Sequence, residues 1–384
     1  MSRGESHFVV YARSACPLVA HSNPCHHEHM TPNDAAASRS AARDWRATRL
    51  TSLLGIEAPV ALGAFGGASS VALTAAVSNA GGLGSYGLYG YSGQRILETT
   101  RALRTATDRP FALNLWLPHA EDGEGGTRAA TDDRAFSQAA ARLAPFFAAV
   151  GIEPPQTPPA RYLPSFDEQL DAVIESSPAA LSLVFGVPDA SLIQRCHDRG
   201  IRVIATATTI DEGVALALAG VDAIVASGME AGGHRVSFLR ASEDSLMGTM
   251  ALVPQLVDAV DVPVIAAGGI GDARGLAASL VLGASGAMLG TAFLATRESA
   301  IAPAYRAVLH SPRGRHTVLT RAMSGRLARG IPNIATAQIS EPAPFPVQTW
   351  LTGQFRAVAS AGNDAELLSL WAWQAGGLSR DQGA

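Results

Sequence analysis

The chain has 384 residues, of which 47% are hydrophobic and 16% are charged, and it contains 38 glycines. This composition can bury one large core with many strand-to-loop corners, and it excludes disorder over most of the length. The net charge of −4 and the absence of a long basic run leave no electrostatic footprint for nucleic acid or anionic lipid. We therefore expect a small-molecule partner, with no nucleic-acid or membrane partner and with a homodimer left open.

Residues 1–48 are polar and aperiodic, and we expect a disordered or non-native tail. The tail contains NPCHHEHM, but no second pair of ligands follows, as a structural zinc site requires, so we expect no metal. The apolar run HFVVYA is too short for a signal peptide, and no run reaches the roughly 18 residues of a membrane span. Three cysteines in so long a chain argue against a disulfide framework, and we predict a cytoplasmic protein.

From residue 56 onward, short apolar runs alternate with helix-like stretches that end in glycine. The runs are continuous, as is typical of parallel strands covered on both faces. The predicted strands are residues 58–65, 81–88, 110–117, 180–186, 201–208, 222–228, 262–269 and 286–293. Eight strand-then-helix units predict an α/β protein, a (β/α)8 TIM barrel over residues 49–384, with a doubly wound open sheet as the alternative.

Two segments exceed a minimal barrel. Residues 119–179, after the third strand, hold one candidate amphipathic helix, DDRAFSQAAARLAPFFAAVG, and we expect this insertion to act as a lid at the carboxyl-end face. Residues 302–384 form a C-terminal extension whose aromatic end, LLSLWAWQAGG, must pack on the rest of the chain. Neither segment is long enough for a second core domain.

Glycines follow the seventh and eighth predicted strands, where barrels of this kind commonly hold a phosphate. Gly268 and Gly269 let backbone N–H groups approach an anion, and a helix that starts near Asp272 points its positive end at the same place. Gly290 and Thr291 supply the other wall. These glycines could merely turn the chain, but two such corners together predict a phosphate site.

The sixth predicted strand leads into GMEAGGHR, which places His234 at the reactive face of a barrel. The preceding glycines let the backbone approach a flat bound group, and an imidazole can act as a base near neutral pH. A lone loop histidine is more often a solvated surface residue. The position and the glycines favour a catalytic role.

The sequence also resembles the nitronate monooxygenases, which are FMN-dependent barrel enzymes. The resemblance runs from about Leu54 to Leu378. It rests on AAVSNAGGLGSYG, RPFALNLWLP, RVIATATT, GMEAGGHR, PQLVDAVDVPVIAAGGI and GAMLGTAFL, followed by TRAMSGRLARGI. It implies FMN-dependent oxidation of alkyl nitronates, or of nitroalkanes, by O2 to a carbonyl compound and nitrite.

The resemblance also implies roles for individual residues. His234 matches the catalytic histidine, which hydrogen-bonds the nitronate or removes the α-proton of a nitroalkane. The flavin carries the redox chemistry. The positions implied for FMN binding are Gly63, Ala64, Phe65, Asn114, Trp116, Thr206, Gly233, Gly268, Gly269, Gly290 and Thr291.

Four positions depart from the pattern of the family. Many relatives have proline and methionine at Ala64 and Phe65, and histidine at Val184. Trp373 stands where glycine is expected, and we expect it to narrow the pocket. These departures put the substrate in doubt more than the cofactor.

Other readings stay open. An FMN-dependent NAD(P)H:quinone or enoyl-thioester reductase shares this scaffold, and a catalytically degenerate flavin-binding protein would explain the departures. An IMP-type dehydrogenase needs a cysteine after the sixth strand, and residues 228–254 contain none. The chain has no lysine, which excludes Schiff-base catalysis and a Walker phosphate loop.

Overall fold

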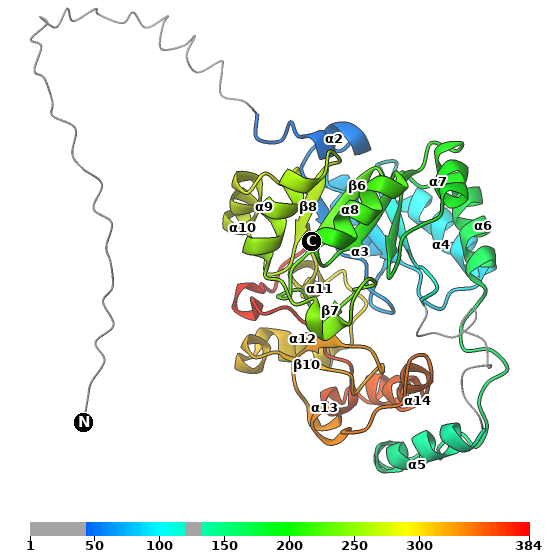
Figure 1. Ribbon diagram of the computed structural model, residues 1–384. Helices are drawn as coiled ribbons and strands as arrows, with labels where there is room; N and C mark the ends of the chain where they lie inside the picture. The colour runs from blue at the N-terminus through cyan, green and yellow to red at the C-terminus, as the bar shows by residue number, and fades with distance from the viewer. Residues whose placement is uncertain (1–43, 120–132) are drawn as a thin grey trace, which may run out of the picture. The chain divides into compact units, whose positions relative to one another are not determined.

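The computed structural model describes residues 44–119 and 133–384. The predictions for residues 1–43, including the histidine-rich NPCHHEHM segment, and for residues 120–132 of the insertion lie outside the described residues. The compact unit Trp45–Ala384 contains the barrel and the C-terminal extension. Figure 1 shows strands surrounded by helices, with the extension, coloured orange to red, on one side of them.

All eight predicted strands are present, and each is shorter than its apolar run. They are β1 (Val60–Leu62), β2 (Gly84–Gly87), β3 (Phe111–Trp116), β4 (Ala180–Val184), β5 (Arg202–Ala207), β6 (Ala223–Ser227), β8 (Val264–Ala267) and β9 (Gly286–Leu289). They pair in parallel in the order β1-β9-β8-β6-β5-β4-β3-β2. The order predicts a barrel if the two edge strands meet.

The edge strands β1 and β2 do meet. Ala61 and Leu83 form a parallel bridge. The Leu62 N–H donates to the Leu83 carbonyl at 2.9 Å, and the Leu83 N–H donates to the Val60 carbonyl at 2.9 Å. The sheet therefore closes into a barrel, and the doubly wound alternative is wrong because no edge is left open at this seam.

Helices follow the strands and begin at polar caps. The side chains of Ser70, Asp189 and Thr209 each accept an N–H from the first turn of the helix that follows. The helices of the barrel are α2 (Arg49–Leu54), α3 (Val71–Asn79), α4 (Gly93–Ala106), α6 (Phe166–Ser176), α7 (Ala190–His197), α8 (Ile210–Ala219), α9 (Thr249–Ala259), α10 (Ala273–Val281) and α11 (Thr291–Leu294). Residues 119–179, for which the sequence predicted one helix, contain two: α5 (Asp133–Ala149) and the barrel helix α6.

The amino-terminal end of the barrel is filled by helix α2. A capping box between Thr48 and Thr51 fixes the start of this helix. Leu50 is fully buried and belongs to the same apolar cluster as Ala61, Ile204 and Val225 of the strands. Since α2 covers this end, a ligand site is left to the carboxyl ends of the strands.

The C-terminal extension adds helices and a small sheet that the sequence did not predict. Strand β7 (Gly233–His234) pairs antiparallel with β11 (Ala328–Gly330), which pairs with β10 (Val318–Thr320). The helices of the extension are α12 (Pro303–His310), α13 (Ile334–Gln338) and α14 (Val347–Ala361), with short 3-10 turns at Pro312–Arg315, Ala365–Leu367 and Gly376–Leu378. A further 3-10 turn, Ser242–Asp244, lies between β7 and α9. The extension thus shares a sheet with the loop that follows β6.

A second apolar cluster anchors the extension. Phe146 and Phe147 of α5 pack on Phe355 of α14, with ring centroids 5.7 and 5.6 Å apart. Leu368 and Leu370 of the aromatic C-terminal end are buried in the same cluster. The expectation that this end packs on the rest of the chain is confirmed.

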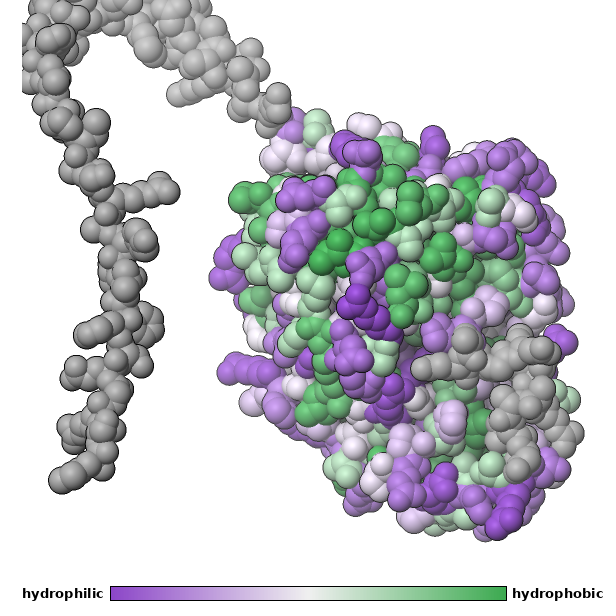
Figure 2. Space-filling view, viewed as in Figure 1, coloured by the Kyte–Doolittle hydropathy of each residue, from purple (hydrophilic) through white to green (hydrophobic). Residues whose placement is uncertain are grey.

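Apolar side chains are also exposed on consecutive barrel helices. Leu218 of α8, Met250 of α9 and Val281 of α10 are more than half exposed, and Figure 2 shows apolar surface over α8.

Within residues 44–119 and 133–384, no helix is long and apolar enough to cross a membrane. The oligomeric state stays a prediction.

Candidate active site

A cavity of about 520 Å³ lies at the carboxyl ends of the barrel strands. Its wall contains residues at or just after the ends of most strands. These are Gly63, Asn114, Trp116, Ser182, Val184, Thr206, Ser227, Gly268 and Gly290. The rest of the wall comes from the β6–β7 loop and the C-terminal extension. A cavity of this size fits a cofactor or a drug-sized ligand.

The predicted site residues converge on this cavity. Those that line it are Gly63, Ala64, Phe65, Asn114, Trp116, Thr206, Gly233, His234, Gly268, Gly290 and Thr291. Gly269 is not part of the lining. A Cβ at Gly269 would lie 3.5 Å from Glu230 Cβ, so this side of the residue faces Glu230.

Two corners of the cavity present backbone N–H groups. Within the described part of the chain, the N–H groups of Gly268, Gly269, Gly290 and Thr291 donate to no acceptor. Gly268 has a φ of +111°, and a Cβ there would lie 2.8 Å from Thr249 Oγ1, so only glycine fits without strain. Free donors at two adjacent strand ends form a site that suits an anion.

His234 reaches the cavity from strand β7. Its Nε2 lies 2.8 Å from Ser324 Oγ. The Ser324 hydroxyl donates to the Arg326 carbonyl at 3.1 Å and accepts from the Arg326 N–H at 3.3 Å, so its remaining lone pair can accept a hydrogen bond from Nε2–H. This assignment leaves the Nδ1 of His234 with a lone pair, and no partner for Nδ1 is found among the described residues.

The surroundings of His234 keep its imidazole neutral. Burial lowers its pKa to about 3, with further lowering by the charges of Arg326 and Arg356. The described lining of the cavity contains no aspartate or glutamate. Positive charges around a neutral imidazole, with no carboxylate in the described lining, favour an anionic ligand.

Aromatic rings hold Arg326 beside this site. Its guanidinium carbon lies 4.2 Å from the Phe185 ring centroid and 4.1 Å from that of Phe345. Arg326 is 3% exposed. The two ring faces stabilise a buried positive charge close to His234.

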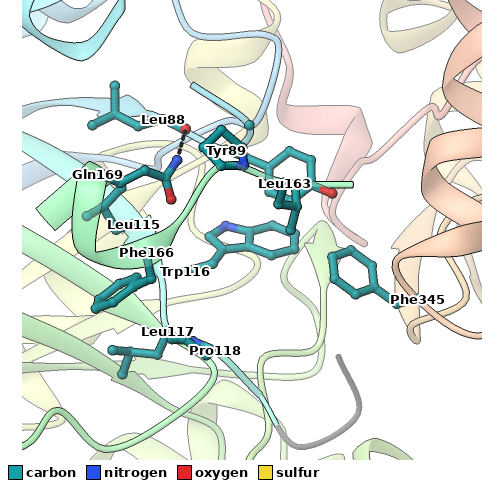
Figure 3. A pocket seen from close by; sticks show the side chains of 12 residues that line it. Leu88, Tyr89, Leu115, Trp116, Leu117, Pro118, Leu163, Phe166, Gln169 and Phe345 are labelled. Atoms are coloured by element: carbon teal, nitrogen blue, oxygen red, sulfur yellow. Dashed lines mark hydrogen bonds between the residues drawn. The ribbon is translucent and has the colours of Figure 1, made fainter. Parts of the chain in front are cut away.

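Trp116 separates the main cavity from a smaller apolar pocket. The smaller pocket has a volume of about 50 Å³ and is lined by Tyr89, Leu115 and Phe345, among others. Figure 3 shows the indole of Trp116 beside both Tyr89 and Phe345, whose ring centroids lie 4.5 and 6.0 Å from its own. Trp116 also lies edge-on to His234, with a centroid distance of 5.2 Å.

Comparison with known proteins decides the family. The profile described as nitronate monooxygenase matches residues 47–383. The chain belongs to the nitronate monooxygenase family. It is therefore an enzyme, a flavin-dependent oxidoreductase, as the sequence resemblance had suggested.

Curated relatives and solved structures agree with this family. A probable nitronate monooxygenase of Staphylococcus aureus (strain JH9) is 36% identical over 340 residues, covering 86% of this chain and 92% of the relative. One of Staphylococcus saprophyticus is 36% identical over 338 residues, covering 85% and 91%. Nitroalkane oxidase from Streptomyces ansochromogenes has a TM-score of 0.78 and 34% identity, covering 87% and 94%. FabK from Thermotoga maritima has a TM-score of 0.66 and 29% identity, covering 88% and 91%.

Some departures from the nitronate monooxygenase pattern lie in the cavity wall. Val184 places an isopropyl group there instead of an imidazole. The backbone N–H of Trp373 donates to Thr291 Oγ1 at 3.1 Å. The Trp373 ring packs so closely on Gly271 that a Cβ at Gly271 would lie 2.3 Å from the ring. Trp373 thus contacts the corner that includes Thr291.

The sequence missed the part of this nitronate monooxygenase site that the C-terminal extension supplies. Ser324, Tyr305, Ser369, Trp371 and Arg356 all contact the cavity or His234. Ser324 and Arg326 lie in the quoted motif TRAMSGRLARGI, which therefore contained a usable signal. Arg356 gave none, because an arginine on an amphipathic helix is usually solvated.

Proposed function

We propose that this chain binds FMN and oxidises alkyl nitronates with O2 to a carbonyl compound and nitrite. The observation that carries the proposal is a neutral His234 in a cavity that is lined by Arg356 and by no described carboxylate. The same cavity has free backbone N–H donors at the corners after β8 and β9. FMN, when bound, supplies the electron transfer to oxygen.

The described residues fit a flavin nucleotide. The N–H groups of Gly268, Gly290 and Thr291 would hold its phosphate. Gly63 lets the β1 corner approach the β9 corner, since a Cβ on Gly63 would lie 3.1 Å from Gly290 Cα. Ala64, Phe65, Asn114, Trp116, Thr206 and Gly233 would surround the ring system, as the family resemblance implies.

His234 would orient the substrate and exchange a proton with it. Ser324 holds Nε2, so Nδ1 is the nitrogen that can accept a proton. A base whose pKa is lowered to about 3 is a weak acceptor for the α-proton of a neutral nitroalkane, so the preformed nitronate is the preferred substrate. An approaching anion raises the pKa of His234, so Nδ1 can take up a proton and then donate a hydrogen bond to the substrate.

Two measurements test this function. The purified protein should show flavin absorption bands, and His234→Ala should keep FMN bound while turnover of ethylnitronate falls about 10²- to 10⁴-fold. Unchanged turnover in that variant would remove His234 from the mechanism.

A stopped-flow experiment separates the reductase alternative, which the likeness to FabK keeps in view. The anaerobic flavoprotein is mixed first with NADH and then with ethylnitronate. A nitronate monooxygenase should leave its flavin oxidised with NADH and react with the nitronate. Rapid reduction by NADH would favour a reductase, and a tightly bound flavin without turnover on nitronates, quinones or enoyl thioesters would favour a degenerate protein.

A further inference from the structure

One face of helix α14 lines the cavity. The residues on this face recur at helical spacing, as Gly353, Arg356, Ala357 and Ser360. Three of them are small, and Ala357 and Ser360 are exposed, so this face lies at the mouth of the cavity. The guanidinium of Arg356 is the charged group that a ligand meets on this wall.

Among the described residues, Arg356 donates its hydrogen bonds to neutral oxygens. Its Nη1 donates to Ser369 Oγ at 3.0 Å, and its Nη2 donates to the Thr349 carbonyl at 3.0 Å. Its Nε is buried and has no partner among the described residues. A guanidinium has five N–H donors, so its capacity is only partly used.

No carboxylate of the described chain balances the charge of Arg356. Burial lowers its pKa, and Tyr89 is the group that opposes this effect. Burial also lowers the pKa values of Arg235 and Arg329, but nearby carboxylates oppose this lowering. These are Glu212 and Glu230 for Arg235, and Glu230 for Arg329. A largely desolvated cation without a counter-ion among the described residues is costly, and a bound anion in the cavity that Arg356 lines would offset this cost.

The anion is not expected to be the phosphate of a flavin nucleotide. The free N–H groups that suit a phosphate lie after β8 and β9, at Gly268 and Gly290. Arg356 instead lies on α14, and its charge lowers the pKa of His234. Arg356 and His234 both line the cavity, so one bound substrate can meet both side chains.

We propose that Arg356 binds the negative charge of the substrate on the α14 wall and thereby selects the nitronate over the neutral nitroalkane. This inference rests on the proposed function, because it takes a nitronate as the substrate. Both forms have nearly the same size, so charge is the property by which the cavity can distinguish them.

The kinetic test compares Arg356→Gln and Arg356→Lys with the wild-type flavoprotein. The substrates are ethylnitronate and nitroethane kept neutral by rapid mixing. We expect Arg356→Gln to lower kcat/KM for ethylnitronate about 10- to 100-fold, the effect of losing one charge-assisted hydrogen bond, and to change the value for nitroethane less than about threefold. Arg356→Lys should recover part of the loss, since it restores the charge without the planar donors.

A matched control isolates the local charge from the net charge. Arg109 pairs with the exposed Glu57 at 2.6 Å, near the amino-terminal end of the barrel. Arg109→Gln changes the net charge by the same amount and should leave both substrates unaffected. An equal loss for ethylnitronate and nitroethane in Arg356→Gln would overturn the proposal, because a merely structural role would affect both.

Binding of nitrate, a planar oxyanion, provides a readout that does not depend on turnover. In calorimetric titration, the wild type should bind nitrate at least about tenfold more tightly than Arg356→Gln, with the Kd for FMN unchanged. Equal nitrate affinity would overturn the proposal, and so would a tenfold change in the FMN Kd, which would assign Arg356 to the cofactor. If the wild type binds nitrate through Arg356 but does not oxidise ethylnitronate, the proposed function fails while the anion site stands.

Discussion

His234 Nε2 and Ser324 Oγ lie 2.8 Å apart although 90 positions separate them in the sequence. Strand β7 carries His234 and pairs with β11, whose preceding turn carries Ser324, so the C-terminal extension orients a side chain of the barrel loop. This part of the cavity wall is therefore built from two segments that fold against each other.

Replacing Ser324 tests this orientation. Ser324→Ala should lower kcat for ethylnitronate about fivefold, equivalent to one hydrogen bond of about 1 kcal/mol, because the imidazole loses the partner that holds Nε2. Ser324→Thr keeps the hydroxyl and is the matched variant. Flavin content and the thermal unfolding midpoint should be unchanged in both, and an unaltered kcat in Ser324→Ala would show that Ser324 does not position His234.

The lowered pKa of His234 predicts acid sensitivity. In the unfolded chain His234 titrates near pH 6.5, and in the folded chain its pKa is about 3, so between these values the unfolded state binds the additional proton. The free energy of unfolding should therefore fall as the pH is lowered from 6.5 towards 3, by up to about 1.4 kcal/mol per pH unit from this group, with no contribution above pH 7. Urea unfolding at pH 7, 6 and 5 measures the slope.

His234→Asn supplies the control for this slope. The variant lacks the titrating group, so its stability should depend less on pH over the same range. Identical slopes in the wild type and the variant would mean that the imidazole is not held neutral.

A methyl group at Gly268 should distort the corner after β8, where the free backbone N–H groups suit an anion. Its φ is +111°, and the new Cβ would lie 2.8 Å from Thr249 Oγ1 and 3.2 Å from the Gly228 carbonyl. Gly268→Ala should lower the stability by about 1–3 kcal/mol and weaken FMN binding. Gly200→Ala is the control, because Gly200 has a φ of +71° with no atom within 4 Å of its Cβ and lies in the turn after α7. Fluorescence titration with FMN should show a larger Kd for Gly268→Ala only.

Trp116 should limit the length of the substrate. Trp116→Ala would join the pocket of about 50 Å³ to the main cavity of about 520 Å³. The ratio of kcat/KM for the nitronate of 1-nitrobutane to that for ethylnitronate should then rise, by about fourfold for each methylene newly buried. Trp116→Phe keeps most of the wall and should change the ratio little. An unchanged ratio in Trp116→Ala would place the alkyl chain elsewhere.

Local sequence patterns predicted the barrel well because each strand-helix unit is marked by an apolar run and a glycine that are close together in the sequence. The run DAIVASG is continuous and apolar, since β6 is buried on both faces, and the following loop ends in two glycines before His234. Strand limits were predicted too long, because apolar residues continue into the buried corners beyond the paired residues. The two-residue strand β7 had no pattern of its own, and its partner β11 is too distant in the sequence to be recognised.

The sequence by itself determined the strand-helix repeat, the glycine corners and the candidate histidine, because these depend on residues that are neighbours in the chain. Only the tertiary structure showed that Ser324 forms a hydrogen bond with His234. It also showed that Arg356 of α14 lines the same cavity without a described carboxylate partner. The physical reason is that the burial and the charge balance of a side chain depend on residues far away in the sequence. These residues come into contact only when the extension packs against the barrel.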